Sequence, residues 1–118
     1  MKNYNLVIHD VAEGDGFRRA EIVGSLDSHT VVAFEQSVQD LVHGGAGTVV
    51  LDICNLTYIS SAGISALMGL KYKLQQRDEE LVLFKPTEKV LRVFKMLGFT
   101  SIFRIVDNES AFASPPNR

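Results

Sequence analysis

The chain has little of several features that define common protein classes. Its 118 residues include a single cysteine, so no disulfide can form within the chain. No apolar run approaches the ~18 residues that a membrane-spanning helix requires. The first five residues lack the charged-then-apolar order of a signal peptide. We therefore expect a cytoplasmic protein without membrane insertion, folded as one domain because this length suits one hydrophobic core.

Charge of one sign is also scarce. The formal net charge is −2, and the lysines and arginines are scattered along the sequence. Such scatter offers no basic stripe that could follow a phosphate backbone, so direct nucleic-acid binding is not expected. The one cysteine, Cys54, lies in an apolar stretch, where a thiol usually behaves as a small buried hydrophobic side chain.

Hydrophobic periodicity predicts an alternating order of strands and helices. An opening hairpin is expected from the alternation of Tyr4, Leu6 and Ile8, the turn residues at 13–16 and the apolar run at 20–24. Helices are expected from 27–28 to 44–45, from Ser60 and Ser61 onward, and from 86–87 to a stop at Gly98. Further strands are expected at 48–53, 81–84 and 102–106, and a short link joins the strand at 48–53 to the second helix.

The apolar stripes of two helices predict which faces are buried. In the second helix the stripe is Gly63, Leu67, Leu70 and Leu74, widened by Ile64 and Met68; in the third it is Val90, Leu91, Phe94 and Leu97. The order of elements predicts an α/β fold, a small mixed sheet of about four to five strands with three to four helices against it. We expect residues 1–113 to form this single domain and 114–118 to form a flexible tail, because two prolines prevent a helix from continuing.

The segment from Val49 to Ile64 is the most informative part of the sequence. It runs from a buried strand through Leu51-Asp52 into a helix that opens with Ser60-Ser61-Ala62-Gly63-Ile64. Together with Gly24-Ser25-Leu26-Asp27 before the first helix, it resembles the signature of the STAS family, named for sulfate transporters and anti-sigma-factor antagonists. The order of elements resembles that family along nearly the whole chain.

The resemblance implies a non-catalytic regulator that switches partners. In such a system the unmodified domain binds an anti-sigma factor that is also a serine kinase with a histidine-kinase-like ATPase domain, which frees a sigma factor. Phosphorylation of one serine blocks binding, and a separate metal-dependent serine phosphatase restores it. By position that serine is Ser61, with Ser60 as the second candidate because it replaces an aspartate common in the family. The implied partner-binding residues are Asp27, Ser60, Ser61, Ala62, Gly63 and Ile64, and the chain itself needs no cofactor or metal.

A helix start suits such a modification physically. First-turn amides and the positive end of the helix dipole tolerate a phosphate that carries roughly −1.5 to −2 charges, so the fold survives while the docking surface changes. Serine is also a preferred helix cap regardless of function. Two other hypotheses therefore stay open: a structural STAS subunit of a stressosome-like or lipid-transport complex without a phosphorylation cycle, and small-ligand or nucleotide binding suggested by the glycine turns.

Other motifs are better explained by structure than by chemistry. A serine hydrolase would need a small residue two positions before Ser61, where Ile59 stands, and the histidines at 9, 29 and 43 lie in predicted loops. The glycines at 44–47 lead from a helix into a strand, which is typical of a helix stop and not of a phosphate-binding loop. The carboxylates at 78–80 suit a solvated turn, and Lys71, Lys73 and Arg77 an exposed helix face that could contact an acidic partner.

Overall fold

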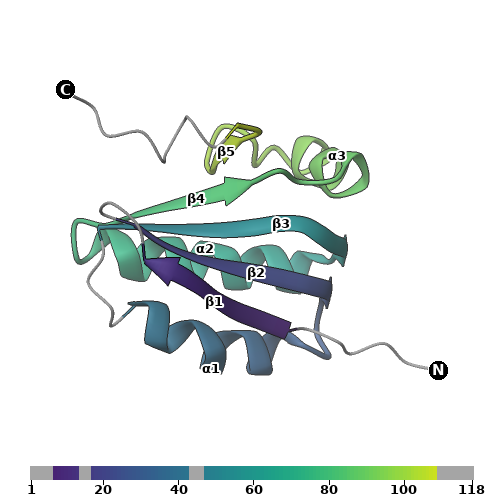
Figure 1. Cartoon of the computed structure of the whole chain (residues 1–118). Helices are drawn as coiled ribbons and strands as arrows, with labels where there is room; N and C mark the ends of the chain where they lie inside the picture. Colours follow the sequence, from purple (N-terminus) through teal and green to yellow (C-terminus); the bar gives the residue numbers. More distant parts are fainter. Residues whose placement is uncertain (1–6, 14–16, 43–46, 109–118) are drawn as a thin grey trace.

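The computed structural model describes residues 7–13, 17–42 and 47–108. Within them, five strands alternate with three helices after an opening strand pair (Figure 1). The strands are β1 (Val7–Glu13), β2 (Phe17–Leu26), β3 (Thr48–Ile59), β4 (Glu80–Phe84) and β5 (Arg104–Val106). The helices are α1 (Val31–Val42), α2 (Ser61–Gln75) and α3 (Glu88–Met96).

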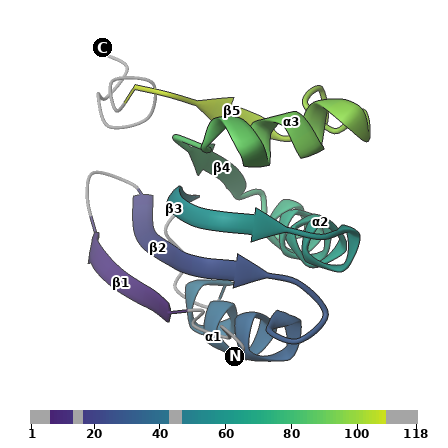
Figure 2. The same cartoon turned by 90° about the vertical axis from the view of Figure 1, so that its right-hand side faces the viewer.

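The strands form one mixed sheet in sequence order. β1 pairs with β2 in antiparallel fashion, and β2, β3, β4 and β5 pair in parallel. Each parallel connection carries a helix, and successive right-handed crossovers in one direction place these helices on one face of the sheet (Figure 2). The predicted α/β fold, with a hairpin followed by alternating helices and strands, is confirmed.

The hydrophobic core lies between the helices and the covered face of the sheet. β3 contributes Val49, Leu51 and Ile53 to it, and Leu67 and Leu74 of α2 meet them from the helix layer. The opposite face of the sheet holds a smaller cluster of Val50, Val82 and Phe84. Because central strands are thus apolar on both faces, the continuous apolar run of β3 is explained.

The central strand is longer than the sequence predicted. β3 does not end at Ile53; it continues to Ile59, so the expected link between strand and helix is itself strand. Two irregularities in its pairing with β2 shift the register, one after Glu21 and one after Gly24. These shifts replace strict alternation by burial of Ile53, Leu56 and Ile59 at every third position, a pattern that does not look like a strand.

Two expected buried positions are exposed. Met68 of α2 is 38% exposed and Leu97, just after α3, is 49% exposed. The other members of the α2 stripe are buried, as are Val90 and Phe94 of α3, while Leu91 is half-buried. Both stripes were therefore predicted too wide, because each helix rests on the sheet along a narrow line and its flanks meet solvent.

Several predictions fall outside the described residues. They concern Tyr4 and Leu6, the turn at 14–16, His43 with the glycines at 44–46, and the tail at 114–118. The last strand is shorter than predicted, because residues 100–103 form a turn and a bend that ends in the buried ring of Phe103.

Candidate functional site

The candidate site lies at the edge of the sheet where the parallel strands end. β2 ends at Leu26 and β3 at Ile59, and these two residues are paired in register. The chain enters α1 and α2 from this edge, so both helix N-termini lie there (Figure 1). The motifs at 24–27 and 60–64, far apart in sequence, are thereby brought together.

The two adjacent serines have different structural roles. Ser60 is the N-cap of α2: its hydroxyl accepts a hydrogen bond from the Gly63 amide at 3.3 Å. Its own amide donates to the Leu26 carbonyl at 3.0 Å, which ties α2 to the end of β2. Ser61 is the first residue of the helix and is exposed. Ser60 therefore has a structural role as the cap of α2, whereas the side chain of Ser61 faces solvent.

Gly63 is required by close packing. A Cβ atom at this position would lie 2.4 Å from the Leu26 carbonyl oxygen and 2.9 Å from Cγ1 of Ile59. Such a distance to a backbone oxygen cannot be relieved by rotating a side chain. The first turn of α2 is thus pressed against the ends of β2 and β3, and its position is fixed.

Asp27 organises the neighbouring turn. Its carboxylate accepts a hydrogen bond from the His29 amide at 2.9 Å, and its own amide donates to Thr30 Oγ1 at 3.0 Å. Thr30, which is 2% exposed, donates its hydroxyl proton to the Ser25 carbonyl at 2.9 Å. These reciprocal bonds form a capping arrangement before α1. The carboxylate is therefore half-buried and oriented at the same edge as Ser61.

The predicted partner-binding residues separate into a surface and its support. Asp27, Ser60 and Ala62 are half-buried and Ser61 is exposed, so their outer atoms can touch another protein. Gly63 is buried, and Ile64 is 1% exposed within the core. The structure thus places these last two beneath the surface, where they position the helix.

Two apolar residues at this edge were not predicted. Val32, in the first turn of α1, is 62% exposed, and Tyr58, at the end of β3, is 46% exposed. Ser65, one turn after Ser61 on α2, is also exposed. Tyr58 lies in the segment predicted as a link, and its position at this edge becomes clear only because that segment is part of β3 and pairs with β2. Exposed apolar side chains beside an exposed hydroxyl give the edge the mixed character of a protein-binding surface.

For Cys54 and the carboxylates of the turn before β4, the structure gives no reason to replace the structural roles predicted from the sequence. Cys54 is half-buried, and desolvation together with a hydrogen bond to Asp52 raises the pKa of its thiol. Among the described residues no group of three or more acidic, histidine or cysteine side chains could hold a metal ion. Glu80 pairs with Arg104 at 2.9 Å and Glu79 with Arg77 at 3.7 Å.

The basic residues of α2 do not share one surface. Lys73 lines a groove between α1 and α2, whereas Lys71 lines another on the β5 side. The predicted basic face is therefore divided between two sides of the helix.

Comparison with known proteins identifies the family. The model of the STAS domain matches residues 10–112. The chain belongs to the STAS domain family. This STAS domain is 35% identical over 100 residues to BtrV of Bordetella bronchiseptica, a protein named as an anti-sigma factor antagonist, covering 85% of this chain and 86% of that protein.

Solved structures of similar shape show the same fold. An anti-sigma factor antagonist from Thermotoga maritima superposes with a TM-score of 0.76 at 19% identity, covering 92% of each chain. The Bacillus cell fate determinant SpoIIAA in its phosphorylated form gives a TM-score of 0.63 at 19% identity, over 90% of this STAS domain and 95% of that chain. In the described residues, no helix combines the length and apolar character needed to cross a membrane.

Proposed function

We propose that this STAS domain is a cytoplasmic anti-sigma-factor antagonist that switches partners through Ser61. The observation that carries the proposal is the contrast between the two serines. Ser61 is exposed at the first position of α2, whereas the hydroxyl of Ser60 is engaged as the helix cap. A kinase can reach the Ser61 hydroxyl without unfolding the turn. In this scheme the chain is a ligand and substrate, not an enzyme.

The relatives support this role. BtrV, which is 35% identical over most of both chains, carries the name of an anti-sigma factor antagonist. SpoIIAA, of the same fold, is described in a phosphorylated form. We infer that the partner here is an anti-sigma factor that is also a serine kinase with a histidine-kinase-like ATPase domain. The kinase transfers a phosphoryl group from its bound ATP to Ser61 Oγ, whose proton is lost, and releases ADP.

The consequence of phosphorylation follows from the position of Ser61. The first turn of α2 contains no acidic residue, and the amides and dipole of a helix N-terminus accept negative charge. The phosphate therefore leaves the fold intact. It adds roughly −1.5 to −2 charges beside Asp27 and the exposed Tyr58, in the centre of the proposed docking surface. Lost complementarity and like-charge contacts there cost roughly a hundredfold or more in affinity.

A second candidate function keeps the fold without the cycle. A STAS domain can act as a structural subunit of a stressosome-like or lipid-transport complex. The observation that favours it is Ser60, which caps α2 where the family commonly has an aspartate. A cap needs only an oxygen acceptor, so the change preserves the helix while removing one carboxylate from the surface.

Phosphosite mapping and binding measurements test the proposal. Protein from the native host is analysed by mass spectrometry, and the serine-kinase anti-sigma factor of that host is titrated with wild type, Ser61→Ala and Ser61→Glu. Phosphate on Ser61, binding kept by Ala and weakened about a hundredfold by Glu support the switch. Ser101→Glu, in an exposed turn remote from this edge, is the matched control and leaves binding unchanged. Equal binding by all forms, with neither Ser60 nor Ser61 modified, overturns the switch in favour of the structural subunit.

A further inference from the structure

α2 carries a row of exposed side chains that begins at Ser61. Ser65, Met68 and Tyr72 follow it at spacings of four, three and four residues, which places all of them on one face of the helix. Ser65 is exposed, and Met68 and Tyr72 are 38% and 63% exposed. The opposite side of the helix, which includes Leu74, packs in the core. This outer row therefore extends from the candidate site along most of α2, over about 16 Å at 1.5 Å per residue.

The edge around Ser61 is too small to bind a protein partner by itself. A specific interface covers ~800 Å² and about 20–30 residues on each side, whereas this edge offers a handful of outward residues, among them Asp27, Val32 and Tyr58. The other exposed large apolar residues of the described chain form two groups: Met68 and Tyr72 on α2, and Met96, Leu97 and Ile102 at the end of α3 and in the turn after it. Of these two groups, only the first continues the surface at Ser61 along the same helix face.

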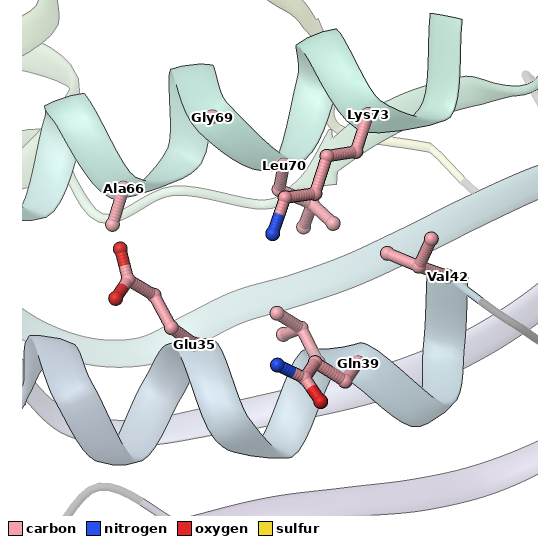
Figure 3. Close-up of a pocket in the computed structure, with 8 residues that line it drawn as sticks. Glu35, Gln39, Val42, Ala66, Gly69, Leu70 and Lys73 are labelled. Carbon is pink, nitrogen blue, oxygen red and sulfur yellow. The ribbon is translucent and has the colours of Figure 1, made fainter. Parts of the chain in front are cut away.

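The far end of the outer row is basic on both sides. α2 contains no acidic residue, and its two lysines stand immediately before and after Tyr72. Lys71 lines a groove on the β5 side of the helix. Lys73 lies on the α1 side, where its ammonium group turns toward the middle of the groove between α1 and α2 (Figure 3). A protein that covers Tyr72 therefore meets an aromatic ring with a positive charge on either flank.

The near end of the outer row has acidic neighbours instead. The Asp27 carboxylate lies at the same edge of the sheet as Ser61, and Glu35 of α1 points toward Ala66 of α2 (Figure 3). Opposite charges at the two ends of a surface orient a bound protein and fix its register. The matching partner therefore carries acidic groups where it covers Tyr72, and not where it meets Ser61.

We propose that the outer row of α2 is a second docking site for the anti-sigma factor, which receives Met68 and Tyr72 in an apolar pocket with an acidic rim. The inference rests on the proposed function, because it takes the same partner, and it adds a contact that the phosphate on Ser61 does not reach. Tyrosine is enriched among the residues that dominate interface affinity. Since Tyr72 lies about 16 Å from Ser61 along the helix, it contributes to binding of the kinase and not to the transfer of the phosphoryl group.

Binding and phosphorylation kinetics separate this role from that of Ser61. The serine-kinase anti-sigma factor of the native host is titrated with wild type, Met68→Ala, Tyr72→Ala and Ser61→Glu, and phosphoryl transfer is measured with the first three. Tyr72→Ala weakens binding about tenfold or more and raises KM with kcat unchanged, and Met68→Ala does so to a smaller extent. Met96→Ala, the same truncation at a 76% exposed methionine of α3, is the matched control and leaves binding and KM unchanged. Since the truncated side chains are exposed, circular dichroism will show an unchanged fold.

Charge reversal tests the acidic rim. Lys71→Glu and Lys73→Glu each slow association with the anti-sigma factor about tenfold at low salt, because like charges then face each other. Lys95→Glu, which makes the same change on α3, leaves the association rate unchanged. Association of both α2 variants at the wild-type rate overturns the acidic rim.

The same titrations distinguish failure of the second docking site from failure of the switch. If Ser61→Glu loses binding while Tyr72→Ala binds like wild type, the switch holds and the second docking site is wrong, even where Tyr72→Ala has lost self-association in sedimentation. A Tyr72→Ala variant with lowered kcat and the wild-type KM overturns it as well. If Tyr72→Ala loses binding while Ser61→Glu does not, the docking site holds and the switch is wrong. A wild-type chain that does not bind the kinase overturns both.

Discussion

Two glycines of the same helix predict opposite responses to the same substitution. Gly63→Ala and Gly69→Ala each add one methyl group to α2. At Gly63 the methyl carbon would lie 2.4 Å from the Leu26 carbonyl oxygen, while at Gly69 it would meet nothing within 4 Å. Replacement of a helix-interior glycine by alanine stabilises by roughly 0.5–1 kcal/mol where the methyl group fits.

The clash at Gly63 outweighs that gain. Forcing an extra methyl group into a packed position costs about 1–3 kcal/mol. The displaced helix also lengthens the hydrogen bond from the Ser60 amide to Leu26, which is 3.0 Å long, and a typical bond of this kind contributes ~1 kcal/mol. We therefore expect Gly63→Ala to destabilise by roughly 1–3 kcal/mol and Gly69→Ala to stabilise by about 0.5–1 kcal/mol.

Urea titrations and thermal melts, both followed by circular dichroism, measure the two changes as free energies of unfolding and as melting temperatures. At roughly 4 °C per kcal/mol for a domain of this size, the melting temperatures of the two variants should differ by about 6–16 °C. Equal stability of the two variants, or a Gly63→Ala variant as stable as wild type, would refute the assigned contact between α2 and Leu26.

Three further predictions concern the same edge and the sheet. Ser60→Ala, which removes the cap of α2, should lower the free energy of unfolding by ~1 kcal/mol, whereas exposed Ser61→Ala should change it by less than ~0.5 kcal/mol; equal losses in urea titrations would contradict the cap. Thr30→Val, which leaves the Ser25 carbonyl and the Asp27 amide without their buried partner, should cost about 1–3 kcal/mol by calorimetry, and a neutral result would refute that network. Cys54, whose pKa is raised, should react with maleimide more slowly than an exposed thiol at about pH 8. The folded state favours the neutral thiol, so the contribution of Cys54 to the free energy of unfolding is present below the pKa of the unfolded chain and is lost as pH rises through the higher pKa of the folded state. If the contribution of Cys54 instead increased as pH rose through these two values, the raised pKa would be wrong.

The fold could be predicted because its core follows simple periodicities. The stripe of Leu67, Leu70 and Leu74 in α2 and the apolar run at 49–51 in β3 satisfy the helix and strand templates directly. Where the pattern failed, a local irregularity was the cause. Residues 54–59 look like a loop because two register shifts against β2 break the alternation, and such shifts depend on the partner strand.

The position of the candidate site in the fold could be predicted from the sequence, but which of its residues are exposed and which are buried could not. The motif located Asp27 and Ser61, and the structure brings their chain segments together. Sequence alone could not separate Ser61, which is exposed, from Ile64, which is 1% exposed, because both belong to one motif. Nor could it reveal the exposed Tyr58, since exposure at the end of a strand depends on what the rest of the fold covers.

The position of α2 at the candidate site is fixed by the close contact between Gly63 and the Leu26 carbonyl and not by outward-facing side chains. This contact involves a backbone oxygen, a backbone amide and the absence of a side chain, so it constrains few residue types besides the glycine itself. The outward positions, Val32, Tyr58 and Ser61 among them, can then vary without disturbing how α2 is seated. After gene duplication, two copies of such a domain could acquire different partners by a handful of surface substitutions, each neutral for folding. Parallel signalling routes in one cell could thus be insulated from one another at little cost in stability.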